Sequence, residues 1–246
     1  MIVMTLTDYT LNTAPADGNE PDSFEEQPSS DLYREIHKGI RYAMFHTTME
    51  AGALDVDDDD CVKTLVARCN DLVDLLELHH HHEDVYVEPL VERHAPELGL
   101  TVEWQHDAVE RGMFRLRVLA ARLAEAAPLP RRQLAHRLYL ELGRFTAMYL
   151  EHQLFEERHV MPALCATISA EEIDAVHDTL KQNIPPDVMA GALQVMLPAL
   201  NVDERAAMLG GMSMAPPPVF AVFRAAAERA LTPDQFAQVA ARIGLH

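Results

Sequence analysis

Two segments of the chain repeat one pattern of potential metal ligands. The pattern reads His-x-x-x-Glu-[Asp/Glu]-x-x-x-x-Pro, and it begins at His79 and again at His152. In an α-helix, residues four positions apart lie on one face, about one turn apart. His79 with Glu83, and His152 with Glu156, therefore each direct an imidazole and a carboxylate toward the same point. Each pair is suited to chelate a metal ion.

A single histidine precedes each copy at a similar distance, His37 in the first case and His106 in the second. The repeating unit is thus a histidine, a turn and the His-x-x-x-Glu pair. The acidic segment at 54–60 and the Ala-Pro-Leu-Pro segment at 127–130 predict the two turns. The sequence therefore predicts four helices arranged as two hairpins.

The heights of these histidines along the helices follow from counting residues to each turn. With a rise of roughly 1.5 Å per residue, His37 and His79 lie nearly level, and the same count places His106 level with His152. His46 would be displaced from His79 by roughly 16 Å along the helix and cannot share the site. The predicted site contains four imidazoles and two carboxylates, those of His37, His79, Glu83, His106, His152 and Glu156.

A buried cluster of this kind needs cations. Carboxylates that face each other repel, and unpaired buried charge is costly, so the cluster is stable mainly when metal ions occupy it. Two divalent or trivalent ions fit the two-fold repetition of the ligands. A mixed set of imidazoles and carboxylates suits iron, manganese or zinc. Six protein ligands leave room on two such ions for an oxygen bridge and an exogenous ligand.

At this point residues 31–166 resemble the hemerythrin-like HHE cation-binding domains. The resemblance lies in the histidine of REIHKGIR, the two repeat segments and the histidine of EWQHDAV. It implies an antiparallel up-down four-helix bundle that holds two iron ions, a non-haem diiron centre with an oxo or hydroxo bridge; manganese and zinc are less expected. It also implies a small diatomic or peroxide ligand: the centre would bind or sense dioxygen, or react with peroxide or nitric oxide.

The chain departs from the oxygen-carrying hemerythrins at two positions. Glu110 stands where those proteins have a second histidine in the third helix, and Glu157 stands where they have an aspartate in the fourth. A site richer in carboxylate should favour oxidised iron, so reversible oxygen carriage is the less expected use. Glu110 lies one turn from His106 on the same face, and is either a seventh ligand or a solvated glutamate.

Other residues near the repeat leave alternatives open. His80, His81 and His82 point in different directions around the helix, so most of them are expected at the surface. His80 is either a bridging or exchangeable ligand or one of these surface residues. Tyr86 and His159 occupy equivalent positions in the two copies, and we expect them in the core or around the ligands, where they could hydrogen-bond a bound peroxide.

A ferritin-like, iron-handling carboxylate bundle is an alternative, since it uses Glu-x-x-His on two helices. Glu77 with His80, and Glu156 with His159, match this spacing. The two pairs stand at different distances from the prolines that follow them, however, so they would lie at different heights. The register therefore favours the His-x-x-x-Glu interpretation.

Composition predicts an all-α protein with more than one part. The chain has 246 residues, of which 48% are apolar and only 10 are glycine, with long stretches of helical periodicity. Residues 1–30 are polar and acidic and are expected to form a flexible tail. Residues 31–166 would form the bundle, and residues 167–246 a smaller C-terminal helical domain or extension.

The C-terminal part shows clear helix boundaries. Capping boxes at Ser169 and Thr232 begin two of the expected helices. Helices are predicted near 170–183, 187–197, 202–210, 217–230 and 233–243. The methionines and leucines of this part are expected to form a core. The alternative is an apolar groove for a protein partner or a homodimer contact.

Charge and cysteine content restrict the partners and the compartment. A net charge of −19 argues against nucleic acid and anionic membranes as partners. There is no apolar run of the length needed to span a membrane. The three cysteines make no disulfide framework, and the N-terminal residues do not resemble a signal peptide, so we expect a cytoplasmic protein.

Two kinds of function remain open at this stage. The first is a diiron protein that binds, senses or turns over a small ligand, with catalase-like, peroxidase-like or oxidase activity as the enzymatic forms. The second is an iron-responsive or redox-responsive regulatory protein without turnover, in which the metal orders the bundle and the C-terminal helices transmit this to a partner.

Overall fold

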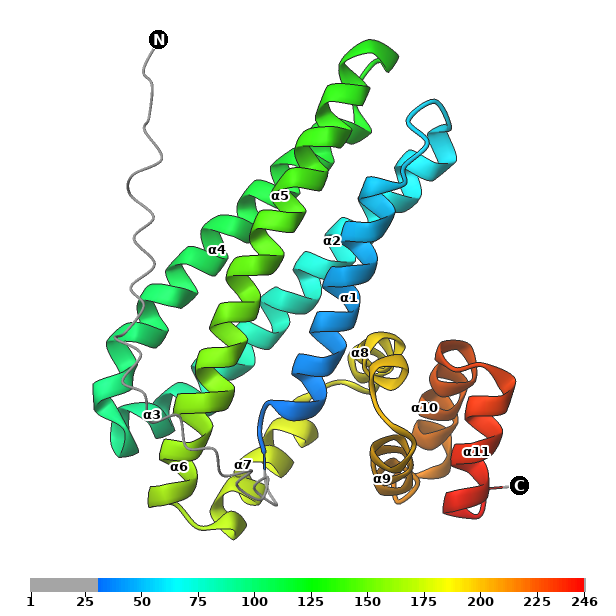
Figure 1. Cartoon of the computed structure of the whole chain (residues 1–246). Helices are drawn as coiled ribbons and strands as arrows, with labels where there is room; N and C mark the ends of the chain where they lie inside the picture. The colour runs from blue at the N-terminus through cyan, green and yellow to red at the C-terminus, as the bar shows by residue number, and fades with distance from the viewer. Residues whose placement is uncertain (1–30, 246) are drawn as a thin grey trace, which may run out of the picture.

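The computed structural model describes residues 31–245, so the predicted N-terminal tail lies outside the described residues. Within this range the chain forms helices joined by short turns, with no β-strand, as the composition predicted (Figure 1). No helix in the same range is both long and apolar enough to cross a bilayer.

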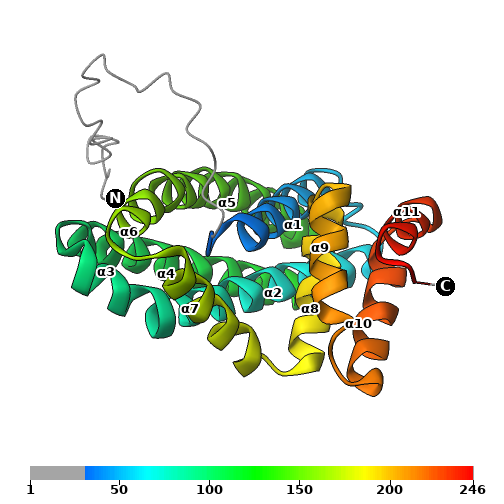
Figure 2. The ribbon, with the colours of Figure 1, turned by 90° about the horizontal axis from the view of Figure 1, so that it is seen from below.

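Four long helices pack against one another in a closed ring. They are α1 (Arg34–Gly52), α2 (Asp59–His82), α4 (Pro96–Ala124) and α5 (Pro128–Phe155). Each contacts two of the others, in the order α1, α2, α4, α5 and back to α1 (Figures 1 and 2). Their shared core is built from buried leucines, valines and methionines.

The two predicted turns lie where the sequence placed them. Helix α2 begins at Asp59, because the carboxylate of Asp58 accepts hydrogen bonds from the backbone N–H groups of Asp60 and Cys61 at 2.8 and 3.2 Å. This is an N-cap, which satisfies backbone donors that a helix start leaves free. Helix α5 begins at Pro128, whose missing N–H costs nothing in the first turn.

The closest approach of α4 and α5 lies at Gly112. A Cβ atom built at this position would lie 2.3 Å from Cδ2 of Phe145, and Phe145 is completely buried. The absence of a side chain therefore lets the two helices approach each other and fixes the spacing of this face.

We expect Gly112→Ala to lower the free energy of unfolding by about 1 to 3 kcal/mol, the usual cost of forcing extra atoms into a packed core. The matched control is Gly143→Ala on α5, where a Cβ would meet nothing within 4 Å. That variant should gain about 0.5 to 1 kcal/mol from helix propensity. Urea unfolding of both variants measures the difference; equal stabilities would refute the close-packing interpretation.

The repeat segments end α2 and α5 in wider, π-helical turns. The turn η1 (Glu83–Val87) leads from α2 into α3 (Glu88–His94), and η2 (Glu156–Val160) leads from α5 into α6 (Met161–Thr167). The proline of each copy follows its turn, and a proline has no N–H to continue the regular hydrogen-bond ladder. The sequence predicted uninterrupted helices here. The difference matters because each wide turn begins at the glutamate of the repeat.

The C-terminal helices match their predicted ranges to within a few residues. They are α7 (Ala170–Asn183), α8 (Pro186–Ala199), α9 (Val202–Met212), α10 (Pro217–Ala230) and α11 (Pro233–Ile243). Both predicted capping boxes are present, and a third lies at Asn201.

Helices α8 to α11 form an apolar cluster of their own and contact the long helices through α8 (Figure 2). Ile173 of α7 instead packs with Tyr33 and Val87. Helix α8 lies on α1 at Gly39, where a Cβ would come within 2.9 Å of Met196. Lys38 of α1 also forms an ion pair with Glu204 of α9. The division of the chain at residue 166 stays a prediction.

Candidate metal centre

All six donors predicted from the repeat lie together in the interior. Their exposed fractions run from 0% for His37 to 6% for His79. The four long helices supply one histidine each, and the two glutamates come from the first position of η1 and of η2. The four histidines lie at similar heights along the long helices, and the π-helical turns add the two glutamates. Together these features bring the six side chains to one region of the core.

The donor atoms fall into two groups that share Glu83. One group contains His37, His79 and Glu83, and in each group the donor atoms lie within 4.8 Å of one another. The other group contains Glu83, His106, His152 and Glu156. Both groups are buried, and each offers the mixture of imidazole and carboxylate that iron, manganese and zinc accept.

Each glutamate lies between histidines of both hairpins. Glu83 has Oε1 at 3.1 Å from Nε2 of His79 and Oε2 at 3.7 Å from Nε2 of His106. Glu156 has Oε2 at 3.4 Å from Nε2 of His37 and Oε1 at 3.5 Å from Nε2 of His152. Each carboxylate therefore lies between a histidine of one hairpin and a histidine of the other. From this position each one could contact two metal ions.

Several of these atoms lack a hydrogen-bond partner among residues 31–245. They are Nε2 of His37, His79 and His106, both carboxylate oxygens of Glu83, and Oε2 of Glu156. A buried polar atom without a partner costs about 1 to 3 kcal/mol, and such atoms are rare in folded proteins. Metal ions would satisfy them together. The residues present therefore fit a metal centre.

Two histidines are oriented from behind through Nδ1. His37 donates a hydrogen bond to Oε1 of Glu157 at 2.9 Å, and His152 donates one to Oε1 of Gln105 at 3.0 Å. Nδ1 of His106 lies 3.0 Å from Oε1 of Glu88 but makes no hydrogen bond with it. Hydrogen bonds of this kind fix the orientation of a ligand imidazole and direct its Nε2 to the metal.

Glu157 therefore has a different place from the one its sequence position suggested. It lies outside both donor groups and does not add a carboxylate to the centre. Arg41 holds it with two hydrogen bonds, at 2.7 and 2.9 Å. Burial raises the pKa of Glu157, but the hydrogen bonds from His37 and Arg41 outweigh this and lower the pKa to about 2.

The imidazoles are prepared to act as neutral ligands. Burial lowers the pKa of His106 to about 4 and that of His152 to about 3, despite the nearby carboxylate of Glu83. Burial also lowers the pKa of His37. Because a metal ion binds only the unprotonated nitrogen, these shifts keep the nitrogens available at neutral pH.

The two central carboxyl groups differ in charge when no cation is present. Burial raises the pKa of Glu83, but the positive charge of nearby histidines, His79 first, outweighs this and holds the pKa below its usual range. Burial and the charge of Glu83 raise the pKa of Glu156 well above its usual value. Glu156 therefore holds its proton to higher pH than an ordinary glutamate, and a bound metal ion would displace that proton.

His80 and Glu110 lie outside the group of six donors. Nε2 of His80 is 3.5 Å from Glu110 and 3.6 Å from Asp84, and these contacts lie on the Nδ1 side of His106. The side chain of Glu110 is 61% exposed. Spacing put Glu110 on the face of His106, but its long side chain turns toward solvent and His80. His80 forms a further group of possible metal ligands with Asp84 and His106, whereas Glu110 belongs to no such group. A role of either residue as a seventh ligand stays a prediction.

The predicted places of Tyr86 and His159 also need correction. His159 is exposed and packs on the ring of Phe155, and Tyr86 is half-buried beside His82. The buried phenols near the centre are instead Tyr33, whose ring lies 5.0 Å from that of His37, and Tyr149, 5.5 Å from that of His152. Burial raises the pKa of both phenols, as do Glu83 and Glu156.

The structure also bears on two alternatives. His46 packs on Tyr42, with 4.4 Å between the ring centroids, and takes no part in the donor groups, as the counting predicted. The pairs of the ferritin-like interpretation do not converge, because Glu77 binds Arg117 at the surface and His159 is exposed. The three cysteines are free, so the chain has no disulfide among them.

Comparison with protein-family models, with curated proteins and with solved structures finds no match to this chain. Fold and site together define an all-helical protein with a buried histidine and glutamate cluster that could hold metal ions. The chemistry of that cluster carries the functional argument.

Proposed function

We propose that the six donors hold two iron ions in a hemerythrin-like, antiparallel up-down four-helix bundle. This non-haem diiron centre would bind, sense or react with dioxygen, peroxide or nitric oxide. The observation that carries the proposal is the position of Glu83 and Glu156 between the histidines of the two hairpins, with their unpartnered atoms directed inward.

Iron, when bound, would supply a change of oxidation state and an open position for the exogenous ligand. The protein supplies the rest. Glu83 and Glu156 would hold the ions together with the four histidines, while Glu157 and Gln105 orient His37 and His152 from behind. The core excludes bulk water from these groups. Tyr33 and Tyr149 keep their phenolic protons at neutral pH, because their pKa values are raised.

A regulatory function without turnover is the second candidate. Helix α8 lies on α1 at Gly39, two residues from His37. A change in metal occupancy could therefore reach the C-terminal helices through packed side chains. A protein partner, or a second copy of the chain, would then bind the metal-loaded and metal-free forms differently.

Peroxide turnover separates the two candidates. We expect the iron-loaded protein to consume hydrogen peroxide, and Glu156→Ala to lose this activity, because the variant removes a carboxylate between the two metal positions. Glu77→Ala, which changes an exposed glutamate of α2, is the matched control and should keep the activity. Oxygen evolution or peroxide absorbance measures the rate. An iron-loaded protein with no turnover would leave the regulatory function as the better account.

A further inference from the structure

A pocket of about 570 Å³ lies between the long helices and the C-terminal helices. Its walls come from α1, α2, α7, α8, α9 and α10. Two of the six central donors, His79 and Glu83, belong to its lining. The C-terminal helices therefore form one side of a pocket whose other side includes residues of the candidate metal centre.

The lining of this pocket is mainly apolar. Leucines of α2 face methionines of the C-terminal helices, among them Met189, Met196 and Met208. Methionine is flexible and polarisable, and it adapts to ligands of irregular shape. The lining also has ionisable residues: Lys181 and Asp178 form an exposed ion pair at 3.0 Å, and Glu35, His82 and His177 lie in the wall.

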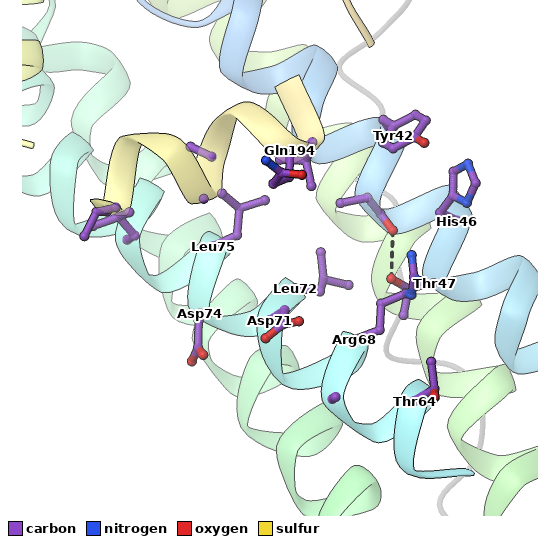
Figure 3. A pocket seen from close by; sticks show the side chains of 17 residues that line it. Tyr42, His46, Thr47, Thr64, Arg68, Asp71, Leu72, Asp74, Leu75 and Gln194 are labelled. Carbon is purple, nitrogen blue, oxygen red and sulfur yellow. Dashed lines mark hydrogen bonds between the residues drawn. The ribbon is translucent and has the colours of Figure 1, made fainter. Parts of the chain in front are cut away.

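A second hollow of about 770 Å³ lies beside α8 (Figure 3). The two hollows share the wall residues Leu75, Leu78, Val188 and Ala192. The second hollow has polar residues in its walls, including Arg68 and Tyr42. The pocket at His79 and Glu83 is the more apolar of the two.

The volume exceeds what the small ligands of the proposed centre require. A water molecule takes a share of about 30 Å³ in the liquid, and dioxygen or peroxide needs little more. Pockets of about 300 to 1,000 Å³ with apolar walls and a few polar groups usually hold organic molecules. Here the wall includes two residues of the centre, His79 and Glu83, although Nε2 of His79 and both carboxylate oxygens of Glu83 are themselves buried.

We propose that this pocket binds an apolar organic molecule with one end against His79 and Glu83. The molecule would be neutral and mainly hydrocarbon in character, since the walls offer few hydrogen-bond partners. Its relation to the centre, as a substrate or a modulator, rests on the proposed diiron function. Binding itself depends only on the pocket.

The test uses the full chain without metal and the neutral fluorescent probe N-phenyl-1-naphthylamine. We expect saturable, blue-shifted emission with one probe per chain. Ala192→Trp places a large ring in the shared part of the two hollows, and Ala207→Trp places one at an exposed position in the pocket wall. Each should weaken binding by about tenfold or more, equivalent to about 1.4 kcal/mol. Ala121→Trp, at an exposed site of α4 outside both hollows, is the control and should bind as the original chain does.

A metal-loaded arm separates this inference from the proposed function. With cobalt in the centre, the emission of the bound probe should be quenched relative to the zinc-loaded protein, because the probe lies against His79. Metal uptake without saturable probe binding would overturn the proposed pocket function and leave the diiron proposal standing. Probe binding that both tryptophan variants leave unchanged would overturn the pocket function in the same way. Equal emission from the cobalt-loaded and zinc-loaded proteins would show that the bound probe does not lie against the metal centre. Probe binding to a chain that takes up no metal would support the pocket and refute the diiron proposal.

Discussion

Glu83→Ala and Glu156→Ala are each expected to lose the metal pair. Glu83 belongs to both donor groups and Glu156 to one of them, so the removal of either takes a carboxylate from the proposed centre. Changing a residue that only orients a ligand typically costs 10-fold to 100-fold in metal affinity. Loss of a central carboxylate should cost more than about 100-fold by the same reasoning, and metal content should fall to one ion or none per chain.

The control for this experiment is Glu110→Ala. Glu110 lies on the same helix as His106, but its side chain is 61% exposed and is outside the donor groups, so the variant should keep both ions. Misfolding is excluded by comparing the metal-free forms. Because its lowered pKa means that the fold favours the Glu83 carboxylate, the metal-free Glu83→Ala chain should be less stable than the metal-free original but still helical, which far-ultraviolet circular dichroism checks. Two tightly bound ions in Glu83→Ala would show that the centre has been wrongly assigned.

The metal-free chain should be most stable near neutral pH and lose stability on both sides. The pKa values of His106 and His152 are lowered to about 4 and about 3 by burial. The unfolded chain therefore binds more protons than the folded chain between about pH 4 and pH 6.5. The free energy of unfolding rises with pH in this window, by about 1.4 kcal/mol per pH unit for each histidine at most.

Glu156 acts in the opposite direction above this window. Burial and the charge of Glu83 raise its pKa, so the folded chain keeps a proton that the unfolded chain releases above about pH 4.5. The stabilisation that this proton represents is lost as pH rises toward the folded pKa. Between pH 4.5 and 6.5 the two histidines outweigh it, and at higher pH the raised pKa of Glu156 makes stability decline.

Urea unfolding of the metal-free chain from pH 5 to pH 8.5 measures both effects. Glu156→Gln carries a neutral group in place of the protonated acid and should abolish the decline above pH 7. His136→Gln changes an exposed histidine and should leave the whole profile unaltered. A profile that is flat across this range in the original chain would contradict the assigned charge states of the buried cluster.

The central donors could be predicted because two simple periodicities determine them. The spacing from His79 to Glu83, and from His152 to Glu156, puts each pair on one helix face, and residue counts from the turns put His37 and His106 at matching heights. The N-caps of two C-terminal helices could also be predicted from the sequence, since a capping box is a local contact between residues three apart.

The residues behind the centre could not be predicted in the same way. Gln105 reaches His152 from another helix, and Glu157 meets His37 and Arg41 only after α1 and α5 have packed. Such contacts depend on helix rotation and on rotamers, which sequence spacing does not determine. Glu110 illustrates the same limit, because its spacing places it on the same helix face as His106 but does not determine where its long side chain points.

The wide turns at Glu83 and Glu156 were also missed, although the sequence contains their signal. The proline six residues after each glutamate removes a backbone donor near the end of the helix. The packing of α8 on α1, and with it the pocket at His79, depends on contacts between segments distant in the chain. Local patterns predict neither.

Metal analysis of the aerobically purified protein, combined with its optical spectrum, tests the central claim most directly. The account predicts about two irons per chain, which is the number that the two donor groups sharing Glu83 would hold. It also predicts near-ultraviolet absorption from oxygen-to-iron charge transfer, absent in Glu156→Ala. A single zinc ion per chain, or no metal after growth with ample iron, would contradict it.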